Sequence, residues 1–133
     1  MFLVDTSVWI DVFRDSSGER AHQLRLVVED GELFLTRFCQ LELLGGCLDE
    51  REWSLLKAYL EVQDYLDAQP ETWESAARIY FELRRKGLTV RSPIDCCIAQ
   101  LALENDLELL HRDRDFVVIA EMRPLRHRWL DWV

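Results

Sequence analysis

The chain has 133 residues, of which 49% are hydrophobic and 31% charged, with only five glycines and three prolines. This size and composition predict a single domain over residues 1–133 and exclude a disordered or fibrous chain. The formal net charge of −9 argues against a nonspecific nucleic-acid binder, because phosphate affinity comes largely from cationic contacts. It does not exclude an enzyme that reaches phosphate through bound cations, since a carboxylate cluster raises the acidic count and a metal ion inverts the local charge.

The cysteines and the apolar runs indicate in which cellular compartment the protein works. No two cysteines have C-x-x-C spacing and no histidine pair lies at zinc-ligand intervals, so we interpret Cys39, Cys47, Cys96 and Cys97 as small hydrophobic side chains. No apolar run approaches the roughly 18 residues that span a bilayer, and the first ten residues contain no Lys or Arg. We therefore expect a protein of the reducing cytoplasm that makes no use of a membrane.

Strands and helices alternate along the first half of the chain. Residues 2–4 are apolar and predict a buried strand that leads through Asp5 directly into a helix. A helix from Glu19 to about Glu29 ends at the turn signal Asp30-Gly31 and precedes a strand over 32–36. Two further helices are predicted, over 38–48 and from about Glu50 to Gln63.

The second half continues the alternation. The predicted elements are, in order, a short strand at 65–67, a helix from Pro70 to Lys86 stopped by Gly87, a helix beginning at Ser92-Pro93, a strand over 107–111, a short helix from Arg114 to about Glu121 and an edge element through Leu125, Trp129 and Trp132. Strands that alternate with helices imply an α/β fold with a largely parallel sheet.

Apolar residues at helical spacing predict which face of each helix is buried. The predicted buried faces are Ala21, Leu24, Val27 and Val28; Phe38, Leu41, Leu44 and Leu48; Trp53, Leu56, Tyr59 and Leu60; Trp73, Ala76, Ala77, Tyr80, Phe81 and Leu83; and Ile94, Cys97, Ile98, Leu101 and Ala102. Glu42 lies off the second of these faces.

Five carboxylates are placed to meet at one edge of the sheet. Asp5 ends the first strand, and Asp113 and Asp115 follow the strand at 107–111, so the carboxyl ends of two parallel strands bring them to the same edge. Glu42 and Asp95 lie in helices that begin near that edge. Converging carboxylates without histidine or thiolate suit Mg²⁺ or Mn²⁺, and such a site favours phosphoryl-ester chemistry.

Each of these acids also has a purely structural interpretation. Ser92-x-x-Asp95 is close to a capping box, and an acid in a first turn is favoured by the helix dipole. Asp5 would cap the first helix, Asp113 or Asp115 would cap the helix that follows them, and Glu42 would be a solvated helix residue. The pattern of residue types leaves these alternatives open.

Four segments carry a resemblance to a known family. VDTSVWID at 4–11, QLELLGG at 40–46, VRSPIDCCIAQLAL at 90–103 and LLHRDRDF at 109–116 resemble the signature segments of PIN domains, in the family's order and at similar intervals. The compact form with a D-T-S opening and a DRDF segment is similar to VapC toxins of type II toxin–antitoxin systems. The resemblance implies a three-layer α/β/α fold with four to five strands and a magnesium-dependent endoribonuclease, with Mn²⁺ as a substitute, that inhibits growth or translation by cleaving RNA such as tRNA or rRNA.

The resemblance also implies roles for individual residues. Asp5 and Asp95 resemble the principal magnesium ligands, Glu42 and Asp113 the acids that complete the cluster, and Thr6 the hydroxyl residue beside the first acid. Many PIN domains have Thr or Ser two residues before the fourth acid, where this chain has His111. His111 would bind phosphate or move a proton, or else be a strand-end histidine hydrogen-bonded to a neighbouring acid. Asp115 would contact metal through water, although we favour the capping role for it.

Arginines near the acids are candidates for RNA contacts, in particular Arg91, Arg112 and Arg114, whereas residues 84–86 suit a solvated helix end. The resemblance implies two protein partners: a VapB-like antitoxin whose C-terminal segment occupies the acidic cleft, and a second copy of the chain in a homodimer.

Other functions stay open to different degrees. A PIN nuclease of RNA processing or single-strand cleavage would have the same site, and a catalytically silent module would act through a partner. A haloacid-dehalogenase-like phosphatase would need D-x-D after the first strand, where Ser7 stands instead, and a receiver domain would need an acidic pair before the end of that strand and a partner lysine late in the chain.

Overall fold

The computed structural model describes residues 1–132 and contains an alternation of strands and helices. The elements are β1 (Phe2–Val4), α1 (Thr6–Arg14), α2 (Glu19–Val28), β2 (Leu33–Thr36), α3 (Arg37–Gly45), α4 (Glu50–Glu61), β3 (Asp64–Leu66), α5 (Pro70–Arg85), α6 (Pro93–Glu104), β4 (Glu108–His111), α7 (Arg114–Ala120) and β5 (His127–Trp129). Every predicted strand and helix is present, with ends that differ by at most three residues. Among the described residues, no helix is both long and apolar enough to cross a membrane.

The five strands form one sheet in the order β3-β2-β1-β4-β5, and every neighbouring pair is parallel. β1 lies at the centre, because the connections run outward from it first to β2 and β3 and then, after α5 and α6, to β4 and β5 on its other side. The predicted α/β fold with a mostly parallel sheet is confirmed. The order reverses between β1 and β4, and crevices at such reversals are where open parallel sheets bind ligands.

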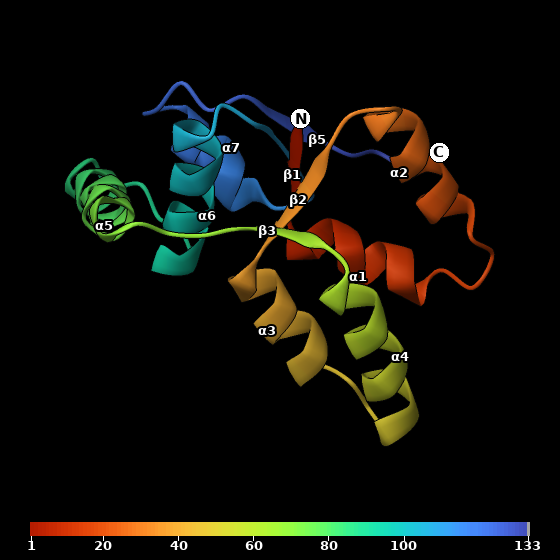
Figure 1. The fold of residues 1–133 in the computed structure, drawn as a ribbon. Coiled ribbons are helices and arrows are strands. Elements are labelled where there is room, and N and C mark those ends of the chain that lie inside the picture. The colour runs from red at the N-terminus through yellow and green to blue at the C-terminus, as the bar shows by residue number, and fades with distance from the viewer. Residues whose placement is uncertain (133) are drawn as a thin grey trace.

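Helices cover both faces of the sheet (Figure 1). Successive residues of β1 point to opposite faces, so Leu3 packs with residues of α5, α6 and α7 while Val4 packs with residues of α1 to α4. Leu109 and Leu110 of β4 divide between the two clusters in the same way. The result is a three-layer α/β/α molecule whose central strands are buried on both sides.

The predicted buried face of α3 is right only in part, because Phe38 and Leu44 are partly buried against the core but the other two residues are not. Leu41 is 68% exposed and Leu48 is 87% exposed, whereas Cys39 and Leu43 are buried. The helix begins at Arg37, immediately after β2, because Oγ1 of Thr36 accepts a hydrogen bond from the Cys39 N–H at 3.2 Å. This junction turns Cys39 and Leu43, four residues apart, toward the sheet.

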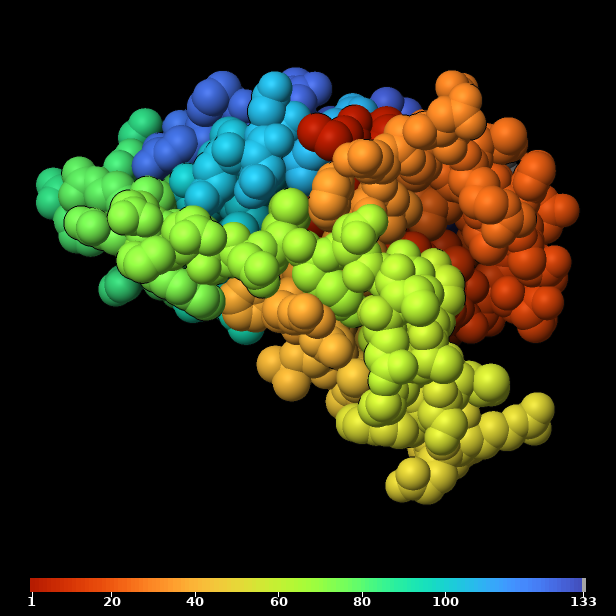
Figure 2. All heavy atoms as spheres, viewed as in Figure 1, coloured from red at the N-terminus to blue at the C-terminus, as the bar shows by residue number. Residues whose placement is uncertain are grey.

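α4 is far less buried than its sequence pattern predicts. Of the predicted face, Leu60 is buried and Leu56 is half-buried, but Trp53 and Tyr59 are 41% and 39% exposed. The helix packs mainly against α3, and its N-terminal end projects from the body of the molecule (Figure 2). The amphipathic pattern of α4 is therefore not fully satisfied within the chain.

The buried face of α5 is rotated from the predicted one. Trp73 and Phe81 are largely exposed, and the buried residues are Thr72, Ala76, Ile79 and Leu83. The small residues at this face allow α5 to lie against α6, where Oγ1 of Thr72 donates to Oε2 of Glu104 at 2.9 Å. In α6 the predicted side is buried except for Ile94 in the exposed first turn, and Cys96 and Ala99 are buried as well.

Candidate metal centre

The acids predicted to converge do so where β1 and β4 end. The backbone N–H of Asp5 donates to the carbonyl of Leu110 at 3.0 Å, so the loop after β1 lies beside the last residues of β4. One carboxylate oxygen from each of Asp95, Asp113 and Asp115 lies within 4.8 Å of the other two. Three acids from two separate segments therefore share one small region.

Asp5 is 7% exposed and has one fixed oxygen. Its Oδ2 caps α1 by accepting from the N–H of Ser7 at 3.0 Å, and it accepts from Oγ of Ser7 at 2.6 Å. Burial raises the pKa of Asp5, the Ser7 hydrogen bonds oppose this, and the charges of Glu42 and Asp113 raise the pKa further. The predicted capping role and a role in the acid cluster are thus compatible, because capping leaves Oδ1 available as a ligand.

Ser7 also joins the two halves of the site. Its Oγ accepts a hydrogen bond from the backbone N–H of Arg112 at 2.9 Å, just after β4. The sequence analysis missed this residue. Its position two residues after an N-cap aspartate was the available signal, but its link to Arg112 depends on the pairing of β1 with β4, which local sequence does not reveal.

Glu42 reaches the site through Thr6. The hydroxyl of Thr6, which is 5% exposed, donates to Oε1 of Glu42 at 3.0 Å. This contact joins the first turn of α1 to α3 and holds a carboxylate from the surface of α3 near Asp5. Glu42 is therefore more than a solvated helix residue, even though the residue as a whole is exposed.

Asp95 lies in the first turn of α6, and its environment opposes ionisation. Burial raises its pKa most, followed by a hydrogen bond with the carboxyl of Asp115 and by the charges of Asp113 and Asp5. Oγ of Ser92 caps α6 by accepting from the Ile94 N–H at 3.1 Å, so the cap does not depend on Asp95. The purely structural interpretation of Asp95 therefore fails to describe its carboxyl group.

The prediction that Asp115 caps α7 is wrong. Asp113 is the cap, because its Oδ1 accepts from the N–H of Asp115 at 2.9 Å. Asp115 is 6% exposed, and its Oδ2 accepts from the backbone N–H of Arg91 at 3.0 Å. Asp113 therefore caps α7 and also belongs to the acid cluster, together with Asp115.

His111 is fully buried, and both of its ring nitrogens are engaged. The N–H of Asp113 donates to Nδ1 at 3.1 Å, so in the neutral ring Nε2 carries the hydrogen and donates to Nδ1 of His127 at 2.9 Å. Burial, and then the nearby His127, lower the pKa of His111 to about 4. The expectation that His111 binds phosphate or moves a proton is therefore corrected, since no ring nitrogen remains for either task.

The structural alternative for His111 needs revision as well. Its acceptor atom faces the backbone of an acid rather than a carboxylate, and its other partner is a histidine from β5. Sequence reasoning missed His127, because only the parallel pairing of β4 with β5 brings it beside His111.

The three candidate RNA-binding arginines have different surroundings. Arg91 forms ion pairs with Asp113 and, at 3.6 Å, with Asp115. Arg112 pairs with Asp11 at 2.9 Å and donates to the carbonyl of Leu130, so it fixes the C-terminal segment. Arg114 is exposed and forms no ion pair with any described residue.

The donor chemistry fits a divalent cation. Oxygens that share one Mg²⁺ at about 2.1 Å lie about 3–4 Å apart, so the grouping of Asp95, Asp113 and Asp115 is close to what one ion requires. Burial, followed by neighbouring carboxylates, raises the pKa of Asp5 and of Asp95. A divalent cation bound to these groups would favour their ionised forms.

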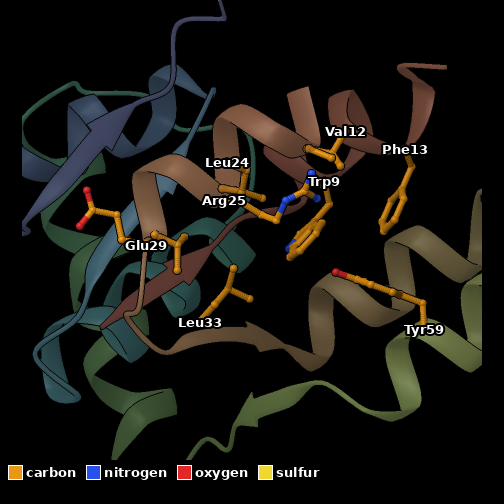
Figure 3. A pocket seen from close by; sticks show the side chains of 10 residues that line it. Trp9, Val12, Phe13, Leu24, Arg25, Glu29, Leu33 and Tyr59 are labelled. Carbon is orange, nitrogen blue, oxygen red and sulfur yellow. The ribbon is translucent and has the colours of Figure 1, made fainter. Parts of the chain in front are cut away.

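A second feature lies away from the acids, between α1, α2 and α4. A groove of about 420 Å³ is lined mainly by apolar side chains, with Arg25 and Glu29 among the polar ones. Trp9, Phe13 and Tyr59 form an aromatic group along it (Figure 3). Phe13 is 44% exposed, which makes this groove an accessible apolar surface.

Known proteins share both the sequence and the fold. The family model described as "PIN domain" matches residues 2–122. VapC ribonuclease Mb1587 of Mycobacterium bovis and Ribonuclease VapC11 of Mycobacterium tuberculosis are each 36% identical over 135 residues, which cover 95% of this chain and 96% of the relative.

Solved structures agree in fold. VapBC2 from Rickettsia felis, bound to a DNA fragment from its promoter, has a chain with a TM-score of 0.78 at 18% identity, covering 98% of both chains. DNA-bound VapBC from Salmonella typhimurium gives 0.78 at 21% identity, covering 99% of this chain and 98% of the other. The sequence match over most of the chain, together with this fold, shows that the protein belongs to the PIN domain family and resembles its VapC members.

Proposed function

We propose that this protein is a metal-dependent endoribonuclease and the toxin of a VapBC-like toxin–antitoxin pair. The observation that carries the proposal is the close grouping of Asp95, Asp113 and Asp115, with Asp5 and Glu42 near them, at the carboxyl ends of β1 and β4. Relatives at 36% identity that match nearly end to end are named ribonucleases, which supports RNA as the substrate.

The acids divide the work of the site. Asp5, Asp95 and Asp113 would bind Mg²⁺, or Mn²⁺ in its place, and Glu42, held by Thr6, would complete the set. When bound, the cation would supply charge neutralisation at the scissile phosphate and an activated water. Ser7 holds Oδ2 of Asp5 and the Arg112 backbone together, so it fixes the separation of the two strand ends. Asp115 positions the loop that precedes α6 through the Arg91 N–H.

No histidine takes part in the proposed reaction. The lowered pKa of His111 and its two hydrogen bonds leave it as a support for the Asp113 backbone. Water activation in the proposal therefore rests on the cation and the carboxylates, which is the division of labour expected of an all-carboxylate site.

RNA contacts are assigned mainly to Arg114. This residue follows Asp113 in the sequence, and it is exposed. Arg112 is a weaker candidate, because its guanidinium pairs with Asp11 and donates to the Leu130 carbonyl. The strongly acidic chain makes such local cations important, since phosphate must approach a molecule with a formal net charge of −9.

The proposed partner is a small VapB-like antitoxin. Chains of the same fold occur in VapBC complexes from Rickettsia felis and Salmonella typhimurium. The apolar groove between α1, α2 and α4 has the exposed aromatic side chains that a partner helix or strand would cover. One segment of the antitoxin would bind this groove, and the C-terminal segment of the antitoxin would lie over the acids. Together they would keep RNA out of the site. The proposed homodimer and cytoplasmic location rest on the family resemblance.

Two alternatives make different predictions. An RNA-processing or single-strand nuclease would use the same acids but would have no neighbouring antitoxin gene. A silent binding module would need no acids, yet all the proposed ligands are present and surrounded by fixing contacts. A short reading frame for a DNA-binding protein that overlaps or immediately precedes this gene is expected for the toxin.

Controlled expression tests the toxin proposal. The wild-type chain should arrest growth and cleave cellular RNA, whereas Asp5→Asn should keep the fold and lose both effects. Asp30→Asn removes an exposed acid from a turn and should behave as wild type. Growth arrest by Asp5→Asn at equal protein levels would contradict the site assignment, and cleavage sites mapped in total RNA would identify the target.

A further inference from the structure

Arg91 lies over the acid cluster and is bound to two of its members. The residue belongs to the loop between α5 and α6. Its Nη2 pairs with Oδ2 of Asp113, and its Nε lies 3.6 Å from Oδ2 of Asp115. Its backbone N–H donates to the same oxygen of Asp115 at 3.0 Å. The main chain of Arg91 is thus fixed beside the cluster, and the guanidinium extends from there over Asp113 and Asp115.

The exposure of the partners is very unequal. The side chain of Arg91 is 77% exposed, whereas those of Asp113 and Asp115 are 13% and 9% exposed. Arg112 differs, because it and Asp11 are each 29% exposed and its guanidinium also donates to a backbone carbonyl. The Arg91 side chain can therefore leave its partners at low cost while the acids cannot move, and no other cation forms an ion pair with these acids within residues 1–132.

A divalent ion would need the same oxygens. Asp113 is a proposed ligand, and its carboxylate oxygens already serve the N–H of Asp115 and the guanidinium of Arg91. A guanidinium within hydrogen-bond distance of these oxygens and a divalent cation about 2.1 Å from them would repel strongly across a partly buried site. The Arg91 guanidinium and a divalent cation therefore cannot bind these carboxylates at the same time.

We propose that Arg91 is an internal counter-ion of the metal-free acid cluster, which competes with the divalent cation and swings away from Asp113 and Asp115 when that cation binds. The inference rests on the proposed metal-dependent function. It assigns Arg91 two successive positions: over the acids before the cation arrives, and free at the rim of the site afterwards, where it is available to an RNA phosphate. Arg91 thereby sets the cation concentration at which the site fills.

Direct titration with Mn²⁺ in the absence of RNA tests this competition. Calorimetry on the purified full chain should show that Arg91→Gln binds Mn²⁺ about 3- to 10-fold more tightly than wild type, because one competing ion pair is removed. Arg91→Lys should fall between them, since lysine keeps the charge but loses the two-point contact of the guanidinium. The matched control is Arg78→Gln, which removes a similarly exposed arginine paired with Glu82 and should bind as wild type.

Release of the side chain has its own readout. In spectra of ¹⁵N-labelled arginine side chains, the Nε–H signal absent from Arg91→Gln identifies Arg91. During a Mg²⁺ titration this signal should move toward the position of a free arginine, whereas that of Arg112 should stay.

The outcomes separate the two proposals. If the wild type and Arg91→Gln bind Mn²⁺ with equal affinity, or if Mg²⁺ does not move the Arg91 signal, the proposed competition is wrong and the metal site is unaffected. If Arg78→Gln binds Mn²⁺ as tightly as Arg91→Gln, only the overall charge matters and the inference fails. Absence of Mn²⁺ binding in every variant would overturn both the metal site and the inference.

Discussion

Oγ1 of Thr6 donates a hydrogen bond to Oε1 of Glu42 at 3.0 Å, across 36 residues of sequence. Thr6 stands next to the first acid of the site, and Glu42 is on a different helix, so this contact links the α3 carboxylate to the strand-end acids. The hydroxyl is buried, and the carboxylate is held at the surface of α3.

Removing that hydroxyl should separate activity from folding. We predict that Thr6→Val, which keeps the side-chain shape, lowers kcat for RNA cleavage about 10-fold or more and costs about 1 kcal/mol of unfolding free energy. Thr6→Ser should restore most of kcat because it restores the donor. Single-turnover cleavage and urea denaturation measure the two quantities, and unchanged kcat in Thr6→Val would show that Glu42 needs no such support.

The metal-free cluster should be a source of instability. The pKa of Asp95 is raised in the folded protein, so its ionised form destabilises the fold above its unfolded pKa, and this cost disappears as pH falls and the carboxyl is protonated. Asp95→Asn should therefore raise the melting temperature of the metal-free protein at pH 7 and show little further gain with Mg²⁺, in contrast to wild type. Calorimetric melting with EDTA and with Mg²⁺ tests this, and a lower melting temperature for Asp95→Asn in EDTA would contradict it.

His111 should make the fold sensitive to acid. Its pKa is about 4 in the folded protein against about 6.5 unfolded, so the unfolded chain binds the extra proton first. The contribution of His111 to stability is complete above about pH 6.5 and is lost as pH falls toward 4. The raised pKa values of Asp5 and Asp95 have the opposite effect, because they make the fold more stable as pH falls. The effect of His111 is therefore measured by comparing variants, not from the pH–stability curve of one protein.

His127→Phe provides that comparison. Phenylalanine keeps a ring against His111 but removes the acceptor for its Nε2–H, which should cost about 1–3 kcal/mol of unfolding free energy at pH 7. The cleavage rate should keep the wild-type pH dependence between pH 5.5 and 8, because burial, the main cause of the low pKa of His111, remains in the variant. Denaturation curves and pH–rate profiles measure these effects, and a pH–rate limb lost with His127→Phe would reassign the pair to the chemistry.

The arginines after β4 should differ in their effect on substrate. Arg114→Gln should raise KM for RNA several-fold with little change in kcat, because it removes an exposed cation near the site. Arg112→Gln should instead lower the melting temperature, because it releases Asp11 and the Leu130 carbonyl at the C-terminal segment. Steady-state cleavage and thermal melting of both variants measure these effects. A raised KM for Arg112→Gln together with a lowered melting temperature for Arg114→Gln would contradict the assignment.

The sequence predicts the fold better than it predicts the faces of the helices. The helix starts after Asp5 and Ser92 carry local signals, namely caps, a proline and, at Asp5, a preceding apolar run, and such signals fix the order of the elements. The inward face of α3 depends instead on Thr36, whose cap starts the helix at Arg37, one residue before the predicted start. That of α5 depends on how closely α6 approaches. Packing partners set these rotations, and apolar periodicity does not identify the partner.

The exposed aromatic residues show a related limit. Trp53, Tyr59 and Trp73 lie at spacings typical of a core, yet they are at the surface of the isolated chain. Periodicity predicts that a face is buried without telling whether the burial is within the chain or against another protein. The proposed antitoxin and homodimer would account for such faces.

At the site, the acids are predictable and their supports are not. Asp5 and Asp113 follow strands, so the topology of a parallel sheet brings them together, and the family resemblance adds Glu42 and Asp95. Ser7 and His127 act through strand pairs that join distant segments, so local sequence could not reveal their contacts. α7 begins at Arg114, as predicted, so the cap falls on Asp113 and Asp115 is left to the acid cluster.

The most direct test of the central claim is RNA cleavage by the purified chain as the divalent cation is removed and returned. We predict cleavage that stops in EDTA, resumes with Mg²⁺ or Mn²⁺, and is absent from Asp5→Asn at every cation concentration, with Asp30→Asn equal to wild type. Cleavage that persists in EDTA, or undiminished cleavage by Asp5→Asn, would contradict the assignment of the acid cluster as a metal-dependent nuclease site.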